Sequence, residues 1–375
     1  MIKVKIAVAG GVTGGHIYPA VAVLDYFKKR GDKMEVLYFA TPHGLENREI
    51  MRLFPEAKIV KLKINGLRRP FYSISNFSVI YNTYRAYLNC VSELRLFKPD
   101  FSFITGGYIS VPLGLASKKL NIPNFIHEQN AIAGLANKII GPKSEKIFIS
   151  FAESARDFNV NFAHKIKHTG NPVRKTEKKD RRIFDYFGIN PNNKIIIVAG
   201  GSKGSDFIND IMLHVYEMIG NSSQYKIVFL HSCGDASFIK KLDKFPFVKA
   251  VPFIIDMHKY LAASDASIIR GGATTVAEVI AYGVPSLIIP WSGAAENHQL
   301  INAISLEKNG AGFYLEEKEA DSIKVLKIIN LLIEKKFSQS IRNNLKLLKP
   351  DYDPSERIYN EIIESLKSLN SHSRT

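Results

Sequence analysis

The sequence predicts an α/β protein with two doubly wound parallel sheets, one in each half of the chain. Short apolar runs alternate with longer amphipathic stretches, a rhythm typical of parallel strands connected by helices. Each half also opens in the same way, with an apolar run, a glycine-rich turn and a helical pattern. The length of 375 residues agrees with two domains, since one domain takes about 100–200 residues.

In the N-terminal half, the first apolar run leads through a glycine turn into a helix expected from about Tyr18 to Lys29. The later runs are bounded by turn residues and are predicted to be strands. The predicted strands of this half are KVKIAVAG (3–10), EVLYFA (35–40), DFSFIT (100–105), NFIHE (124–128) and KIFIS (146–150).

A second series of apolar runs follows a charged break. That break, GNPVRKTEKKDRR at 170–182, lacks apolar periodicity and is typical of a linker. The strands predicted after it are KIIIVAGG (194–201), KIVFLH (226–231), KAVPF (249–253), ASIIR (266–270) and SLIIPW (286–291).

We therefore divide the chain into an N-terminal domain (1–170), a linker (171–185) and a C-terminal domain (186–350). Residues 351–375 are expected to form a C-terminal helix and tail, with the helix over Asp353–Leu369. Its apolar stripe suits packing on either domain, including a return to the N-terminal one.

Composition narrows the class of protein. Hydrophobic residues make up 46% and charged residues 23%, which is typical of a globular protein. The formal net charge of +16 favours anionic partners, although a lysine-rich proteome explains it equally well. Nucleic-acid binding rests on that charge alone, and because no RNA- or DNA-binding motif is present we expect none.

Other classes are excluded by patterns that the sequence lacks. The two cysteines, Cys90 and Cys233, form no CxxC pair, and no HExxH pattern occurs, so we expect no metal cofactor. No apolar run reaches the ~18–20 residues that span a bilayer. The strand pattern that starts at Lys3 leaves no room for a signal peptide. These features predict a cytoplasmic protein.

The first glycine turn, GGVTGGH at 10–16, follows its strand directly. Free N–H groups and the helix dipole at such a helix start favour a phosphate. The spacing does not match G-x-G-x-x-G, and no acidic residue ends the second strand, so a dinucleotide site is disfavoured. The alternative is a tight strand-to-helix turn without a ligand.

A second glycine turn, AGGSKGSDFIN at 199–209, occupies the matching place in the other half. Here Ser202, Lys203 and Gly204 are candidates to face a diphosphate. Ligands of open α/β sheets bind at the carboxyl ends of the strands. Two opposed domains would therefore place both turns at a shared cleft.

A third strand-to-helix turn, RGGATTVAE at 270–278, allows two interpretations. Thr275 and Glu278 have the spacing of a capping box, with Thr275 as the N-cap, and spacing alone favours this. Alternatively, Glu278 binds a ribose diol, because a carboxylate accepts two hydroxyl protons. The amide-rich segment ENHQLINA (296–303) suits a hydroxyl-rich ligand, and a polar helix start explains it equally.

Two polar clusters follow strands in the N-terminal half. TGGYIS (105–110) is a further glycine turn, and HEQNAIAGLANK (127–138) begins with four polar residues in a row. Buried packing disfavours such a row. Because sites of parallel sheets lie at strand ends, we interpret the row as functional.

In their order along the chain, these motifs resemble the MurG family, which is glycosyltransferase family 28. The matching segments run from about residue 4 to residue 315: GGVTGGHIYPA, INGLR, TGGYISVP, HEQNAIAGLANK, GNPVR, GGSKGS, RGGATTVAEVIAYGVP and ENHQLINA. The resemblance implies a GT-B fold, with two Rossmann-like domains facing across a cleft. It also implies an inverting transferase of peptidoglycan synthesis that passes N-acetylglucosamine from UDP-N-acetylglucosamine (UDP-GlcNAc) to lipid I, forming lipid II.

The resemblance further implies a set of site residues in each half. On the donor side, Ser202 would contact the diphosphate, Arg174 would lie at the nucleotide, and the backbone of Ile254 would hold the uracil. Glu278 would bind the ribose and Gln299 would contact the sugar, and the further candidates for binding UDP-GlcNAc are Lys203, Gly204 and Thr275. On the acceptor side, the residues that line the reaction centre would be Thr13, His16, Tyr108 and Asn130, with His16, Tyr108 and Asn130 as the catalytic candidates. The residues of this half that would also bind UDP-GlcNAc are Thr13, Gly14, Gly15 and Asn130.

Some positions depart from the family pattern. Val12 is an additional residue in the first glycine turn, and Thr105 stands where the family usually has Met. Gly271 replaces a serine, and His298-Gln299 replaces a pair of glutamines. We expect Val12 to change how Thr13 and His16 are aimed, and we expect the change at His298-Gln299 to bear on how the sugar is recognised.

An inverting transfer needs a base for the acceptor hydroxyl and a stabiliser for the leaving diphosphate. His16 is the candidate base, because an imidazole titrates near neutral pH; the alternative is that it only orients or caps. No DxD motif is present to hold a metal. The helix start near Ser202–Gly204 would stabilise the leaving group, and a divalent cation would at most assist.

Because lipid I is anchored in the bilayer, we expect a peripheral contact with the cytoplasmic face of the membrane. The segment 64–88 mixes basic and aromatic residues, which suits anionic lipid. They are Arg68, Arg69, Phe71, Tyr72, Phe77, Tyr81, Tyr84 and Arg85. The alternative is an amphipathic core helix under a loop.

Two other functions remain as alternatives. A related GT-B transferase with another lipid acceptor, such as diacylglycerol, is disfavoured by HEQNAIAGL, which belongs to the muramyl branch of the resemblance. A non-catalytic UDP-sugar-binding regulator is disfavoured by the intact His16, Asn130 and Glu278.

Overall fold

The chain divides into two compact units. The computed structural model describes residues 2–67, 76–176, 179–202, 204–220, 227–294 and 297–372. Unit 1 comprises Met1–Arg174 together with Asp351–Thr375, and unit 2 comprises Lys175–Pro350. The change between units falls inside the segment 171–185, and the 3-10 helix η4 (Arg181–Phe187) already belongs to unit 2.

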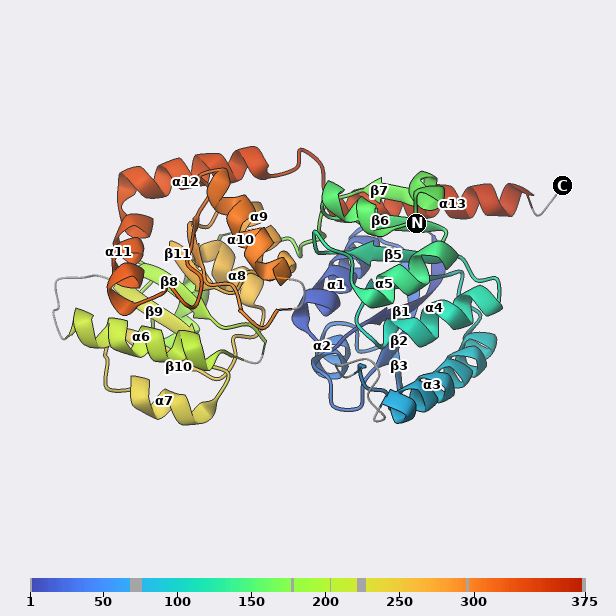
Figure 1. The fold of residues 1–375 in the computed structure, drawn as a ribbon, viewed down its shortest axis with the longest axis horizontal. Coiled ribbons are helices and arrows are strands. Elements are labelled where there is room, and N and C mark those ends of the chain that lie inside the picture. The colour runs from blue at the N-terminus through green and yellow to red at the C-terminus, as the bar shows by residue number, and fades with distance from the viewer. Residues whose placement is uncertain are drawn as a thin grey trace. The chain divides into compact units, whose positions relative to one another are not determined.

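Within the described residues, unit 1 is built on a seven-stranded parallel sheet in the order β3-β2-β1-β4-β5-β6-β7 (Figure 1). The strands are β1 (Lys3–Gly10), β2 (Lys33–Ala40), β3 (Lys58–Lys61), β4 (Phe101–Gly106), β5 (Asn124–Glu128), β6 (Lys146–Ile149) and β7 (Ile166–His168). The helices are α1 (Gly14–Lys29), α2 (Leu45–Leu53), α3 (Asn76–Phe97), α4 (Ser110–Lys119), α5 (Leu135–Ile140), η1 (Gly141–Lys143), η2 (Ala152–Asp157), η3 (Val160–Lys165) and α13 (Pro354–His372).

Both faces of this sheet are covered, which explains its continuous apolar runs. Alternate residues of β1 enter two different cores, because successive side chains of a strand point to opposite faces. Ile6 and Val8 pack with α1 and α13, whereas Ala7 and Ala9 pack with α3 and α4. One face therefore lies under α1, α2 and α13, and the other under α3, α4 and α5.

Unit 2 has, in its described part, a six-stranded parallel sheet in the order β10-β9-β8-β11-β12-β13. The strands are β8 (Lys194–Ala199), β9 (Ile227–Ser232), β10 (Val248–Val251), β11 (Ala266–Ile269), β12 (Ser286–Ile288) and β13 (Phe313–Tyr314). The helices besides η4 are α6 (Asp206–Ile219), α7 (Ala236–Leu242), α8 (Met257–Ala263), α9 (Ala273–Tyr282), α10 (His298–Lys308), α11 (Ser322–Ile333) and α12 (Lys335–Leu348).

The predicted fold class is confirmed, and the ten apolar runs all form strands of the two sheets. The sequence analysis missed β3, β7 and β13, which lie at sheet edges and are short. An edge strand is covered on fewer sides and therefore lacks a continuous apolar run. The start predicted for α1 was also wrong: the helix begins at Gly14, because Thr13 is already its extended N-cap.

Helix α13 packs on unit 1 beside α1 (Figure 1). The ring of Tyr359 lies 4.6 Å from that of Phe27, and its hydroxyl donates to Asp32 Oδ2 at 3.0 Å. Because Asp32 directly precedes β2, the helix lies toward the edge where the strands begin. Glu361 forms an ion pair with Lys146, the first residue of β6, at the same edge.

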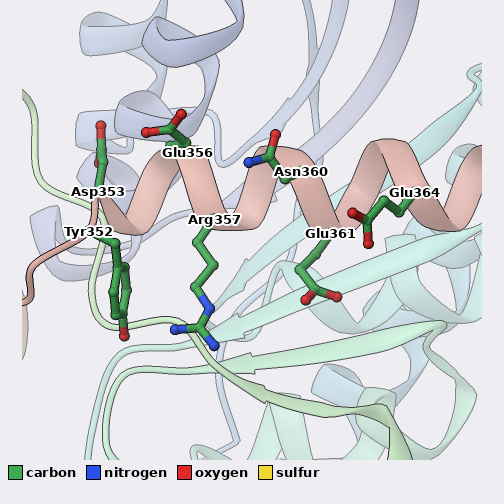
Figure 2. Close-up of a pocket in the computed structure, with 7 residues that line it drawn as sticks. All are labelled: Tyr352, Asp353, Glu356, Arg357, Asn360, Glu361 and Glu364. Carbon is green, nitrogen blue, oxygen red and sulfur yellow. The ribbon is translucent and has the colours of Figure 1, made fainter.

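A shallow hollow lies along α13 (Figure 2). It is lined by Tyr352, Asp353, Glu356, Arg357, Asn360, Glu361 and Glu364. The guanidinium of Arg357 lies 4.6 Å from the centroid of the Tyr352 ring. The hollow is rich in carboxylates, and the glycine turns lie at the other ends of the strands. It is therefore unsuited to an anionic nucleotide.

No helix among the described residues combines the length and the hydropathy needed to cross a bilayer.

Candidate functional site

The glycine turn after β1 is held by contacts from neighbouring elements. A Cβ on Gly10 would lie 1.9 Å from Thr105 Oγ1 and 2.7 Å from His16 O, so only glycine fits there. Val12, the additional residue, has a φ of 77°, which β-branched residues rarely adopt. Its N–H donates to Oε2 of the fully buried Glu46 at 3.2 Å. A residue of α2 thus anchors a strained turn.

The first turn of α1 presents backbone and hydroxyl groups to solvent. Thr13 is exposed, and its side chain makes no capping bond. Its carbonyl accepts the N–H groups of His16 and Ile17 at 3.1 and 3.2 Å. Gly14 and Gly15 are half-buried beside it. The arrangement leaves the Thr13 hydroxyl accessible to a ligand.

The imidazole of His16 is oriented by β4 and by the end of β5. Its Nδ1 lies 3.0 Å from Thr105 O and 3.1 Å from Gln129 Oε1. Both partners are acceptors, so Nδ1 carries the proton and Nε2 keeps its lone pair. A Cβ on Gly106 would come within 3.0 Å of Nδ1, so the ring lies against the glycine backbone. This geometry suits a base that acts through Nε2.

Thr105 also holds the main chain of His16. Its hydroxyl donates to His16 O at 2.6 Å, while its own carbonyl accepts from Nδ1 of the same residue. A methionine, the usual family residue, has no hydroxyl for the first bond. The departure at Thr105 therefore adds a contact to the first turn of α1.

The row of polar residues that begins in the last two residues of β5 is mostly buried, so the premise that packing disfavours it was wrong. His127, Glu128 and Gln129 are at most 1% exposed. Their polar atoms bond to one another and to the loop, which removes the penalty of burying them. The carboxylate of Glu128 accepts four bonds, from Asn130 N (2.9 Å), Asn130 Nδ2 (3.1 Å), Gly134 N (2.9 Å) and Asn137 Nδ2 (2.8 Å).

Asn130 and Tyr108 are the half-buried candidates of this unit. Because Glu128 takes the Nδ2 group of Asn130, the Oδ1 atom is the amide acceptor left for a ligand. The ring of Tyr108 lies against Gly66, where a Cβ would come within 3.0 Å of it. Burial raises the pKa of Tyr108, so its phenol stays protonated near neutral pH.

The catalytic candidates thus follow adjacent strands at one sheet edge. His16 follows β1, Tyr108 follows β4 and Asn130 follows β5, and these strands are neighbours in the order β1-β4-β5. His16 contacts β4 itself through Thr105 and the loop after β5 through Gln129. Their roles in catalysis stay predictions.

Two buried histidines give a prediction for stability. Burial lowers the pKa of His127 to about 4 and that of His231 to about 3. An unfolded imidazole titrates at about 6.5, so the folded state binds fewer protons between these values. This stability is complete above about pH 6.5 and is lost as pH falls toward 4, by up to about 1.4 kcal/mol per pH unit for each histidine.

Urea unfolding at pH 7.5 and pH 5 measures this loss. His231→Phe should remove its share of the pH dependence, whereas the matched change at the exposed His214 should not. Equal pH dependence in all three proteins would contradict the assignment.

The second glycine turn, after β8, is exposed at its tip. Gly201 and Ser202 are exposed, whereas Lys203 lies outside the described residues. Gly204 has a φ of 77°, and a Cβ there would lie 2.3 Å from Cys233 O. Helix α6 starts directly afterwards with Ser205 as N-cap. The turn therefore offers open backbone at the start of a helix, as diphosphate binding requires.

Arg270 organises this side of unit 2, and the sequence analysis did not single it out as a candidate. It is 8% exposed at the end of β11. Its guanidinium donates to Ser205 Oγ, to Ile289 O at 3.0 Å and to Glu317 Oε1 at 2.7 Å. Burial lowers the pKa of Arg270, and Glu317 opposes that shift. The only signal in the sequence was an arginine that ends an apolar run.

The capping-box interpretation of Thr275 and Glu278 was wrong. Helix α9 begins at Ala273 with Gly272 as its N-cap, so Thr275 is already helical. Glu278 therefore stands in the second turn, beyond the reach of an N-terminal capping bond, and is half-buried. Its assignment to a ribose stays a prediction and no longer competes with a cap.

Gln299 lies in the first turn of α10, and Ile254 lies in the loop after β10. Gln299 Oε1 accepts the N–H of Trp291 at 3.0 Å. The Nε2 group of Gln299 is therefore the part of this amide that could donate to a ligand. Ile254 follows β10 and is fully buried in a core cluster, so only its backbone could contact a base. Glu296, from the amide-rich segment, lies outside the described residues.

Two of the departures from the family pattern lie against each other. A Cβ on Gly271 would come within 2.4 Å of Gln299 O. The carbonyl of Gly271 also accepts Asn302 Nδ2 at 2.9 Å. A serine at this position would therefore require α10 to move. The glycine at position 271 is therefore what allows the backbone of the His298-Gln299 segment to lie this close.

Gly271→Ala should displace the start of α10 and raise the donor KM about tenfold, with a smaller change in kcat. Steady-state kinetics over a range of UDP-GlcNAc concentrations checks this. The matched control is Gly272→Ala, because a Cβ there meets nothing closer than 3.8 Å. Equal effects of the two changes would argue against the contact.

Arg174 lies at the end of unit 1, where its Nε is 3.2 Å from Asp25 Oδ2. Burial raises the pKa of Asp25, and Arg174 opposes that rise. The nucleotide role expected for Arg174 stays a prediction. Among the described residues, no group of three or more His, Cys, Asp and Glu side chains could hold a metal ion.

Two doubly wound parallel sheets, each with a glycine turn after its leading strand, are the features of the GT-B fold. The fold is similar to that of MurG from Acinetobacter baumannii, with a TM-score of 0.69 and 23% identity over 97% of this chain and 100% of that one. It is also similar to the structure of S. aureus MnaA with UDP, with a TM-score of 0.68 and 14% identity over 97% of both chains.

The chain belongs to glycosyltransferase family 28: the model of its N-terminal domain matches residues 6–149, and that of its C-terminal domain matches residues 195–357. A relative from Thermotoga sp. is 38% identical over 360 residues, which covers 96% of this chain and all of the relative. A relative from Thermotoga maritima is 37% identical over 360 residues, which covers 96% of this chain and 98% of the relative. Both are named UDP-N-acetylglucosamine–N-acetylmuramyl-(pentapeptide) pyrophosphoryl-undecaprenol N-acetylglucosamine transferase.

Proposed function

We propose that the chain transfers N-acetylglucosamine, with inversion, from UDP-GlcNAc to the C4 hydroxyl of the N-acetylmuramic acid of lipid I. The product is lipid II, a precursor of peptidoglycan. The observation that carries the proposal is the 38% identity over 96% of the chain to relatives named for this transfer. The orientation of His16 supports it.

The chemistry follows from the strand-end groups of each unit. The acceptor oxygen attacks the anomeric carbon opposite the leaving group, a C–O bond forms there, and the bond from that carbon to UDP breaks. Nε2 of His16 takes the hydroxyl proton, since Nδ1 is already protonated. The negative charge that develops on UDP is stabilised by N–H groups at the start of α6, near Ser202 and Gly204.

Release of UDP from UDP-GlcNAc, measured with and without a soluble lipid I analogue, tests the proposal. We expect release to depend on the analogue, and UDP-glucose to be a poor donor. Release driven by diacylglycerol instead would favour the other lipid acceptor. Binding of UDP-GlcNAc without release under any condition would favour a regulator.

We further propose that α3 contacts anionic lipid at the cytoplasmic face of the membrane. Five of its apolar and aromatic side chains, spaced along one face, are exposed: Phe77 (74%), Ile80 (60%), Tyr81 (62%), Tyr84 (58%) and Leu88 (48%). A different stripe of the same helix, which includes Cys90 and Leu94, packs into the core. The helix therefore carries more apolar surface than its packing uses.

Charge supports an anionic partner for this face. The guanidinium of Arg85 lies 6.0 Å from the centroid of the Tyr81 ring, so a cation accompanies the aromatic groups. The exposed stripe disfavours the alternative of a core helix under a loop. Arg68, Arg69, Phe71 and Tyr72, the other residues expected here, lie outside the described residues.

The double change of Tyr81 and Tyr84 to serine should reduce binding to vesicles that contain phosphatidylglycerol by about tenfold, because two interfacial aromatic rings are lost. Co-sedimentation with phosphatidylglycerol and with phosphatidylcholine vesicles measures it. The control is Tyr186→Ser, which changes an exposed tyrosine of unit 2. Equal binding to phosphatidylglycerol and phosphatidylcholine vesicles would contradict the proposal.

A further inference from the structure

A buried chain of hydrogen bonds leads from the end of β7 to His16. Its links are His127 Nε2 to Gly170 O at 3.1 Å, Gln129 Nε2 to His127 Nδ1 at 3.0 Å, and His16 Nδ1 to Gln129 Oε1 at 3.1 Å. His127 and Gln129 are at most 1% exposed, so water does not substitute for these partners. The mechanism above uses only the last member of the chain.

The chemistry of the atoms sets the direction of every link. Gly170 O can only accept, so Nε2 of His127 carries that ring's proton and Nδ1 is an acceptor. The Nε2 group of Gln129 then donates to Nδ1 and also to the carbonyl of His127, at 3.1 Å. The opposite amide orientation would place Oε1 against two acceptors. Only Oε1 is therefore left to face His16.

We propose that Gln129, oriented by His127, is a positioning residue that keeps His16 in the Nδ1–H tautomer and so keeps Nε2 available as the base. The inference rests on the proposed function, because it gives His16 the role of accepting the acceptor's proton. It adds Gln129 and His127 to the one side chain, His16, that the proposed function uses. We call these three hydrogen-bonded residues the relay. Both acceptors of Nδ1, Gln129 Oε1 and Thr105 O, remain in place after Nε2 is protonated.

The relay orients His16 only while the ring of His127 is uncharged. Burial lowers the pKa of His127 to about 4, so this ring is uncharged near neutral pH and keeps one acceptor nitrogen. A protonated His127 would present an N–H to Gln129 and would favour the opposite amide orientation. Near neutral pH, His127 therefore holds the amide of Gln129 in one orientation, with Oε1 facing His16 Nδ1.

The tautomer is measured directly on the full chain, without any substrate. Nitrogen-15 NMR of the histidine rings near pH 8, with His16 assigned by the signal that His16→Ala removes, distinguishes the two neutral forms. We expect a single population with the proton on Nδ1. A His16 that carries its proton on Nε2, or an even mixture of the two, overturns the inference. This measurement requires no variant of the relay itself.

Gln129→Met removes the amide and keeps the length of the side chain. We expect a mixed tautomer of His16 and a kcat about tenfold lower, with the donor KM nearly unchanged, because one hydrogen bond to the base is lost. Tyr216→Phe is the matched control: it breaks a buried bond to another histidine, Tyr216 Oη to His231 Nδ1 at 3.1 Å, in unit 2. It should leave both the tautomer and kcat unchanged.

A Gln129→Met protein that keeps the tautomer and kcat of the wild type overturns the inference. Failure of the proposed function gives a different result. A chain that transfers no sugar, but shows the Nδ1–H tautomer in the wild type and loses it in Gln129→Met, supports the positioning and rejects the transferase assignment.

Discussion

Replacing His16 with alanine is expected to lower kcat by about 10²–10⁴-fold, the range for loss of a positioned general base. Affinity for UDP should change little, because the diphosphate candidates lie on unit 2. The physical reason is the fixed ring: two acceptors bind Nδ1, so Nε2 is the only basic nitrogen in the neutral form. Without it, the acceptor hydroxyl must lose its proton to water.

Single-turnover transfer to a lipid I analogue measures the chemical step, and calorimetry with UDP measures donor binding. The control is His214→Ala, which removes an exposed imidazole from α6. A kcat near that of the wild type in His16→Ala would reduce His16 to an orienting group. A parallel loss of UDP affinity would place the residue at the donor instead.

Glu278→Gln is expected to weaken UDP binding by about 10–100-fold, since hydrogen bonds to a charged group are worth about 1.5–3 kcal/mol. The substitution keeps the size of the side chain. Because α9 is capped at Gly272 and not by this pair, the helix should be unaffected. Thermal unfolding in the absence of a nucleotide checks that point.

A comparison of UDP with 2′-deoxy-UDP isolates the ribose contact. The wild type should prefer UDP, and Glu278→Gln should lose most of that preference, as a double-mutant cycle between protein and ligand requires. An unchanged preference in the variant would refute the ribose assignment, whatever happens to the absolute affinity.

The central strands could be predicted from the sequence because they are covered on both faces. Runs such as KVKIAVAG and KIIIVAGG are continuous and apolar for that reason. Strands at the sheet edges have a weaker apolar pattern. For example, β13 is only Phe313–Tyr314, and its pairing with β12 depends on the rest of the sheet. The start of α1 was placed too late because the glycine-rich segment before Tyr18 was interpreted as a turn, whereas the helix already begins at Gly14.

The loops that form the candidate site were chosen from the sequence, but the contacts within them could not be predicted. Glycine turns and polar strand ends indicated the loops after β1, β5, β8 and β11. The bonds within them join residues that are far apart in the chain, such as His16 with Gln129 and Arg270 with Glu317. Local spacing also misled at Thr275, because the course of the chain at Gly272 decided where α9 begins.

The return of α13 to unit 1 has a consequence for biosynthesis. Unit 2 is inserted between two parts of unit 1, so a ribosome completes unit 2 before it makes Ile358, Tyr359 and Ile362. Those side chains close the core around Phe27, which was made much earlier. The first unit can therefore finish folding only after the inserted one has emerged, and a nascent chain cut short before α13 exposes an open apolar face to chaperones and proteases.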